Sequence, residues 1–169
     1  MKVLLENKVI VARIKELACE IDEYYKDKEA SFVAVMVMNG ALFFGVDLLR
    51  MMKLSPMMDT VAVESYRGTK SCGELTFRST PKISIAGKDI LLIDDIFDTG
   101  VTFGKLQEYF REQGAKSVKT CCLANKLGVE KHCKMPDWVG FDVENYYIVG
   151  YGLDADERYR DLNDICIFK

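Results

Sequence analysis

Two stretches of the chain are apolar almost without interruption, and they restrict the fold more than any other feature. They are SFVAVMVM, residues 31–38, and DILLID, residues 89–94. Short runs that are apolar on both faces are typical of strands inside a parallel sheet that is covered on both sides. Residues 9–25 instead repeat apolar side chains at helical spacing. Strands that alternate with helices predict an α/β fold: an open, mostly parallel twisted sheet with helices on both faces.

The rest of the chain fits the same alternation. Helices are expected over residues 41–52 and 101–114, and strands over residues 60–66, 117–125, 146–152 and 164–168. Residues 67–74 contain two glycines and are expected to form a loop. No repeat, low-complexity tract or linker divides the sequence, which predicts a single domain over residues 1–169.

The composition argues against several classes of protein. The 169 residues are 49% hydrophobic and carry a formal net charge of −3, whereas proteins that bind nucleic acids are more often basic. No apolar run is long enough to span a membrane. The six cysteines form no C-x-x-C pair and the chain has one histidine, so a zinc site is not expected. Reduced thiols in a cytoplasmic protein are the expected state.

An acidic turn follows the second apolar run, in the sequence DDIFDTGVT. Asp94 and Asp95 end the expected strand, and residues 98–102 lead into the next helix. Ligands of open parallel sheets bind beyond the carboxyl ends of the strands. There the unpaired N–H groups of the turn, the helix dipole and two threonine hydroxyls would hold a phosphate, and the glycine would let the backbone bend closely around it. The carboxylates would then bind Mg²⁺ or sugar hydroxyls.

Paired acids after a strand also occur in response-regulator receivers and phosphatases of similar topology, so the acidic pair alone leaves the function open. The full string is more informative, because it joins an apolar strand, two acids, two apolar residues and D-T-G-x-T. This string resembles the phosphoribosyl pyrophosphate (PRPP) motif of the type I phosphoribosyltransferases. Three further stretches resemble the pyrophosphate loop, the mobile lid and the C-terminal segment of hypoxanthine phosphoribosyltransferases: VMNGALFF, ESYRGTKSCGEL and YYIVGYGLDADERYRDLNDICIF.

The resemblance implies the type I phosphoribosyltransferase fold, in which the N- and C-terminal segments form a small hood. It also implies Mg²⁺-dependent transfer of phosphoribose from PRPP to hypoxanthine and guanine, a purine salvage reaction that gives IMP or GMP and pyrophosphate. Two alternatives stay open: a regulatory PRPP-binding module without catalysis, and a phosphoribosyltransferase for another base, xanthine or uracil. A homodimer or homotetramer in the cytoplasm is expected, with neither nucleic acid nor membrane as a partner.

The resemblance also implies roles for single residues. Asp98 would take the proton from N7 of the purine as N9 bonds to the ribose. The other residues implied for PRPP and its phosphates are Asp94, Asp95, Thr99, Gly100, Val101, Thr102, Asn39, Gly40 and Arg160. The implied purine-binding residues are Lys126, Tyr147, Ile148 and Asp154, and the implied metal ligands are Asp94, Asp95 and Asp154. Ser65 and Tyr66 would belong to the lid, whose residues 67–74 are expected to be mobile without ligand.

The chemistry of these residue types agrees with a 6-oxo purine. Lys126 can donate to a 6-oxo group, whereas the amino group of adenine would present a second donor to its ammonium. Tyr147 can stack on any base. Each residue also has an ordinary structural interpretation: Tyr147 as core, Lys126 as a solvated strand end, and Asp154 with Arg160 as a surface ion pair.

Two positions depart from the pattern of the relatives. Asn39 stands where they usually carry a basic residue, so backbone N–H groups are expected to bind pyrophosphate there. The resemblance implies that a cis bond between Met38 and Asn39 aims these groups. Glu130 falls near the position where relatives often carry an arginine, and it stays open whether Lys131 substitutes for that arginine. Pyrophosphate binding is therefore expected to be weaker or differently arranged.

Overall fold

The secondary structure follows the predicted alternation of strands and helices. The computed structural model describes residues 1–65 and 75–169. The elements, in chain order, are β1 (Lys2–Leu5), α1 (Asn7–Tyr25), the 3₁₀ turn η1 (Glu29–Ser31), β2 (Phe32–Met38), α2 (Leu42–Met51), β3 (Met57–Ser65), β4 (Leu75–Ser79), β5 (Asp89–Phe97), α3 (Val101–Glu112), β6 (Ser117–Lys126), β7 (Trp138–Val143), β8 (Ile148–Val149) and β9 (Ile165–Ile167).

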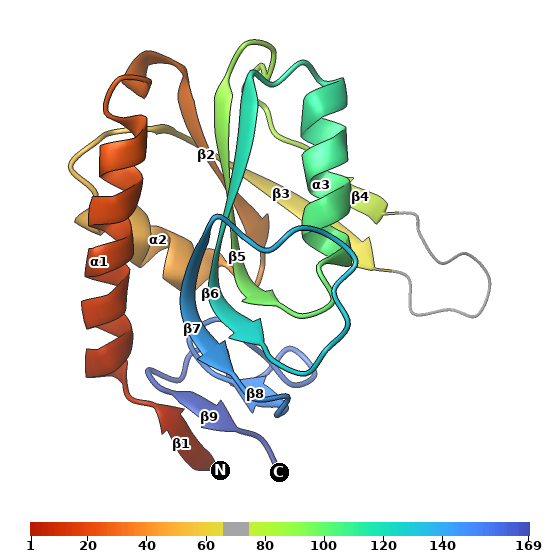
Figure 1. Ribbon diagram of the computed structural model, residues 1–169. Coiled ribbons are helices and arrows are strands. Elements are labelled where there is room, and N and C mark those ends of the chain that lie inside the picture. Colours follow the sequence, from red (N-terminus) through yellow and green to blue (C-terminus); the bar gives the residue numbers. More distant parts are fainter. Residues whose placement is uncertain (66–74) are drawn as a thin grey trace.

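The main sheet has the strand order β4-β3-β2-β5-β6-β7. Its neighbouring strands pair in parallel, except that β4 runs antiparallel to β3 at one edge. The two strands that the sequence predicts to be buried on both faces, β2 and β5, lie side by side in the middle, as Figure 1 shows. The predicted open, mostly parallel sheet is therefore confirmed.

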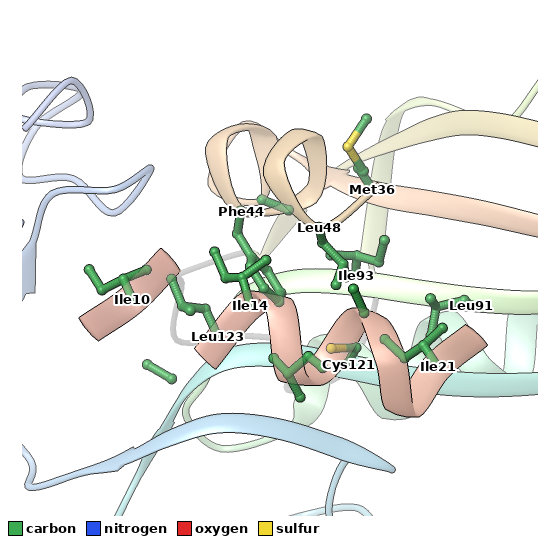
Figure 2. Packing of buried hydrophobic residues seen from close by; sticks show 14 of the residues in the cluster. Ile10, Ile14, Ile21, Met36, Phe44, Leu48, Leu91, Ile93, Cys121 and Leu123 are labelled. Atoms are coloured by element: carbon green, nitrogen blue, oxygen red, sulfur yellow. The ribbon is translucent and has the colours of Figure 1, made fainter. Parts of the chain in front are cut away.

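The central strands separate two apolar cores. On β2, Ala34 and Met36 belong to the core that α1 and α2 cover, whereas Val33 and Val35 belong to the core that α3 covers. Helices thus lie on both faces of the sheet, as predicted (Figure 1). Figure 2 shows the first core, in which α1 and α2 pack against β2, β5 and β6 through Ile10, Ile14, Ile21, Phe44, Leu48, Met36, Leu91, Ile93, Cys121 and Leu123.

The two ends of the chain form a second, three-stranded sheet with the order β1-β9-β8. Its strands are antiparallel, and Lys2 of β1 lies opposite Ile167 of β9. This small sheet lies below the carboxyl ends of the central strands in Figure 1, which confirms the predicted hood. In the part of the chain that the structure describes, no helix is both long and apolar enough to cross a membrane.

Several elements differ from the sequence-based expectations. β5 continues to Phe97, three residues beyond its expected end, because Ile96 and Phe97 still pair with β6. The strand expected over residues 146–152 is reduced to the two residues of β8. The strands β1, β4 and β7 had not been predicted.

A buried carboxylate fixes the start of β5. Asp89 is only 1% exposed, and it accepts hydrogen bonds of 2.6 Å from the hydroxyls of Ser31 and Ser117. Lys116 Nζ lies 3.8 Å from its Oδ2. Burial opposes ionisation, but the hydrogen bonds from Ser117 and Ser31 outweigh it, so the pKa of Asp89 lies below its ordinary value. The carboxylate therefore links the first residue of β5 to the starts of β2 and β6.

Replacement of Asp89 by alanine is expected to lower the free energy of unfolding by about 2–3 kcal/mol, because two part-buried hydroxyls and a lysine lose their acceptor. The folded-state pKa is depressed, so this contribution is present above the unfolded-state pKa and is lost as the pH falls through the folded-state value. The difference between parent and variant should therefore narrow in acid. Urea unfolding at several pH values measures it, with the exposed Asp27→Ala as the matched control. A loss no larger than that of the control would contradict the role of Asp89.

Candidate active site

A polar cleft of about 660 Å³ opens at the carboxyl ends of β2, β5 and β6, next to the hood. Its volume is in the range of sites for small molecules and cofactors. The predicted site residues that line it are Asn39, Gly40, Asp94, Asp95, Asp98, Thr99, Gly100, Val101, Thr102, Lys126, Tyr147, Ile148, Asp154 and Arg160. The structure thus brings together residues that lie more than 100 positions apart in the chain.

The lid is the part of the prediction that the structure does not test. Tyr66 and residues 67–74 lie outside the described residues, and of Ser65 only the backbone, at the end of β3, is described. The expected mobility of this segment therefore stays a prediction.

The turn between β5 and α3 has the form that the sequence predicts. Gly100 has φ of 82°, a left-handed conformation that favours glycine, and it precedes the first residue of α3, Val101. The hydroxyl oxygen of Thr99 accepts a weak hydrogen bond from the N–H of Val101 at 3.5 Å. We call residues 98–102 the phosphate turn, because its N–H groups and the helix N-terminus together can hold a phosphate.

Asp94 and Asp95 lie at the inner wall of the cleft, and each is only 8% exposed. Burial, followed by the charge of Asp95, raises the pKa of Asp94 well above its ordinary value. Burial also raises the pKa of Asp95, although the charge of Arg160 opposes this. Two adjacent, desolvated carboxylates are stabilised as anions by a cation placed between them and the solvent.

The residues of the cleft fit a Mg²⁺ ion that the protein and the substrate would coordinate together. Among residues 1–65 and 75–169, no group of three or more histidine, cysteine, aspartate or glutamate side chains could hold a metal ion alone. Mg²⁺ is commonly bound by one or two carboxylates, with water and substrate phosphate oxygens as the other ligands. The acidic pair provides carboxylates of this kind, while the remaining ligands would come from the substrate and from water.

The loop after β2 faces the same acids. The bond between Met38 and Asn39 is cis, which confirms the prediction for this loop. Gly40 has no space for a side chain, because a Cβ atom there would lie 2.1 Å from Oδ2 of Asp95. On the hood side, a Cβ atom on Gly152, whose φ is 103°, would lie 2.1 Å from the carbonyl oxygen of Gly40. The loop after β2 is thus enclosed between the acidic pair and the hood.

The predicted base-binding residues all line the cleft. Lys126 ends β6, and its Nζ lies 3.8 Å from Oδ2 of Asp98, with side chains that are 13% and 49% exposed. Tyr147 is 53% exposed, so the alternative that it packs in the core is wrong. Its ring meets Phe168 edge-on at 5.6 Å between centroids. Ile148, in contrast, is buried, and its side chain is part of the first core.

Arg160 is held in place by three groups of the hood. Its guanidinium donates to the carbonyl oxygen of Gly152 at 2.7 Å and pairs with Asp154 at 2.9 Å and with Glu157 at 2.8 Å. The ion pair between Asp154 and Arg160 that the structural interpretation expects is therefore present. Both residues also line the cleft, so the pairing does not remove them from it.

Two acidic residues of the cleft had not been predicted, and the role of Lys131 had been left open. Asp156 and Glu157 line the cleft, within the same acidic string that drew attention to Asp154. Lys131 does not line it; instead its Nζ donates to the carbonyl oxygens of Phe97, Asp98 and Lys126. It therefore contacts the backbone behind the cleft.

The fold and this cleft define a class of enzyme, and comparison with known sequences agrees. Residues 1–156 match the sequence model of the phosphoribosyl transferase domain, so the chain belongs to the phosphoribosyltransferase family. The chain is 40% identical over 169 residues to the hypoxanthine-guanine-xanthine phosphoribosyltransferase of Tritrichomonas foetus, covering 99% of this chain and 91% of that protein. It is also 40% identical to the hypoxanthine-guanine phosphoribosyltransferase of Bacillus subtilis, covering 99% and 93%.

Solved structures give the same result. A hypoxanthine phosphoribosyltransferase from Staphylococcus aureus superposes with a TM-score of 0.94 at 32% identity, over 100% of this chain and 91% of that one. The enzyme from Trypanosoma cruzi in complex with IMP superposes with a TM-score of 0.92 at 30% identity, over 100% and 94%. Within its family the chain thus groups with the hypoxanthine-guanine members, and it has their type I phosphoribosyltransferase fold.

Proposed function

We propose that residues 1–169 form a single domain that transfers phosphoribose from PRPP to hypoxanthine and guanine, giving IMP or GMP and pyrophosphate. The observation that carries the proposal is the cleft, in which the phosphate turn, the buried acids and the pair of Lys126 and Asp98 lie together. The names of the relatives from Tritrichomonas foetus and Bacillus subtilis support the choice of these two bases.

PRPP would bind along the carboxyl ends of the strands. Its 5′-phosphate would accept hydrogen bonds from the N–H groups of the phosphate turn and from the hydroxyls of Thr99 and Thr102. Asp94 and Asp95 would bind the ribose hydroxyls, partly through Mg²⁺. When bound, Mg²⁺ would offset the negative charge of the pyrophosphate leaving group.

The purine would occupy the end of the cleft near β6 and the hood. Lys126 would donate to the 6-oxo group, Tyr147 would stack on the ring and the backbone at Ile148 would meet its edge. The bond between C1 of the ribose and the pyrophosphate oxygen breaks with its electron pair on that oxygen, while N9 bonds to C1 and Asp98 takes the proton from N7. The N–H groups of Asn39 and Gly40, with the guanidinium of Arg160, would hold the departing pyrophosphate, and Asp154 would hold a Mg²⁺ ion beside it.

Replacement of Lys126 by alanine is expected to raise KM for hypoxanthine by about 10- to 100-fold, because a charge-assisted hydrogen bond is lost from a largely buried position. KM for PRPP should change much less. Steady-state kinetics with each substrate varied in turn measures both values, and the exposed Lys134→Ala serves as the control of equal charge. An unchanged KM for hypoxanthine would contradict the assignment of Lys126.

One assay tests the proposed function as a whole. The purified protein is mixed with PRPP, Mg²⁺ and each of hypoxanthine, guanine, xanthine, uracil and adenine, and nucleotide formation is followed by absorbance. We expect turnover of hypoxanthine and guanine and poor turnover of adenine. Binding of PRPP without turnover of any base would instead identify a regulatory module, and turnover of uracil alone would identify another transferase.

The proposal includes assembly as a homodimer or homotetramer in the cytoplasm. Leu42, Phe43 and Val46 expose apolar surface along α2, which supports a subunit contact. The thiols of Cys121 and Cys122 are free and buried, which agrees with a reducing compartment. Light scattering after gel filtration would determine the number of subunits.

A further inference from the structure

Three consecutive residues bind the back of the phosphate turn. Lys131 Nζ donates to the carbonyl oxygens of Phe97 at 3.3 Å and Asp98 at 2.6 Å. The N–H of His132 donates to the carbonyl oxygen of Thr99 at 2.8 Å. Sγ of Cys133 lies 3.1 Å from the carbonyl oxygen of Gly100. We call residues 131–133 the backing segment. It provides a partner for four successive carbonyl groups, from Phe97 to Gly100.

These contacts determine which way the turn presents its N–H groups. In a trans peptide unit, the carbonyl of one residue and the N–H of the next point in opposite directions. Carbonyls that are bound on the side of the backing segment therefore leave the following N–H groups, from Asp98 to Val101, directed the other way. Asp98, Thr99, Gly100 and Val101 all line the cleft. The backing segment thus holds the turn in the orientation that an anion requires, before any ligand is present.

Lys131 has a second effect, because it joins two strands. Its Nζ also donates to the carbonyl oxygen of Lys126 at 2.6 Å, at the end of β6. One ammonium therefore links the backbones of Asp98 and Lys126, whose side chains face each other at 3.8 Å. An ammonium has three donors and no acceptor, so these three carbonyls use its full capacity.

We propose that Lys131 is a positioning residue, which orients the phosphate turn for the 5′-phosphate of PRPP without contacting the substrate. The proposal rests on the proposed function, since it assigns the 5′-phosphate to this turn.

The test separates the phosphate turn from the rest of the cleft by using two anions. Ribose 5-phosphate carries the group that the turn would bind, whereas pyrophosphate with Mg²⁺ would bind at the loop after β2 and at Arg160. In Lys131→Met we expect Kd for ribose 5-phosphate to rise about tenfold, as the loss of charge-assisted hydrogen bonds implies. Kd for pyrophosphate should stay within about twofold, the usual range of a surface substitution. Titration calorimetry measures both.

Two further variants control for charge and for geometry. Lys134→Met removes the same charge from an exposed position three residues further along the chain, and it should leave both Kd values within about twofold. Lys131→Arg keeps the charge and the donors and should restore most of the affinity for ribose 5-phosphate. If Lys131→Met does not fold, as judged by circular dichroism, Lys131→Gln takes its place, with a smaller loss expected.

The outcomes are decisive for the inference and distinct from those for the proposed function. Equal Kd values for ribose 5-phosphate in the parent and in Lys131→Met would overturn the positioning role, as would a parallel loss for both anions. A parent that binds no ribose 5-phosphate would overturn it too. A parent that binds PRPP and ribose 5-phosphate but converts no base would defeat the proposed function alone, because the comparison of the variants would still stand.

Discussion

Replacement of Asp98 by asparagine is expected to lower kcat by about 10²–10⁴-fold, the usual contribution of a positioned general base. Asparagine has the same shape, so the turn and its hydrogen bonds should persist, and Kd for PRPP should change little. The amide cannot accept the N7 proton, which is why the loss should fall on kcat. The half-exposed position of Asp98, 3.8 Å from Lys126, leaves its carboxylate accessible to a base in the cleft.

Steady-state kinetics with hypoxanthine, together with titration calorimetry of PRPP, separates these two effects. Asp161→Asn provides the matched control, since Asp161 is exposed and does not line the cleft. A variant that keeps nearly full kcat would show that Asp98 does not accept the proton. A large rise in Kd for PRPP would show that its carboxylate serves binding instead.

Removal of Mg²⁺ is expected to reduce turnover by roughly 10²-fold or more, because offsetting the charge of a leaving phosphate group is worth several kcal/mol. The two buried carboxylates of Asp94 and Asp95 give the structural reason. Burial disfavours their charged form and raises the pKa of each, and a bound cation would offset this effect. The described residues offer no complete set of ligands for a metal. Mg²⁺ should accordingly bind much more tightly in the presence of PRPP than in its absence.

The measurement compares turnover in EDTA with turnover after Mg²⁺ is restored, with potassium chloride at equal ionic strength as the control. Calorimetric titration of Mg²⁺ with and without PRPP tests the shared binding separately from activity. Full turnover in EDTA would argue against any metal in the reaction. Equal affinity with and without PRPP would argue against ligands shared between protein and substrate.

The phosphate turn could be predicted from the sequence because its chemistry is local. A strand, two acids and the turn itself occupy residues 89–102, and each property depends on neighbours in the chain. The central strands could be predicted for a similar reason, since burial on both faces leaves a continuous apolar run. β7 could not be predicted, because Gly140 and Asp142 interrupt its apolar pattern. Its hydrogen bonds with β6 make this segment a strand.

Contacts between distant segments could not be predicted in the same way. The backing segment binds carbonyls that lie 33 or 34 residues away, and carbonyl groups leave no trace in a sequence. Tyr147 has a ring that would suit a core, and only the tertiary structure shows that half of its surface is exposed. The resemblance to known enzymes implied stacking on a base for this residue, whereas the pattern alone favoured a place in the core.

The strand order of the hood has a consequence for the order in which the molecule is completed during synthesis. β9 lies between β1 and β8, yet it leaves the ribosome after both of them. A nascent chain can already contain the main sheet and the phosphate turn while β1 and β8 still lack the strand that joins them. The proposed purine site would then form after the phosphate turn, and deletions in β9 should affect it before they affect the phosphate turn.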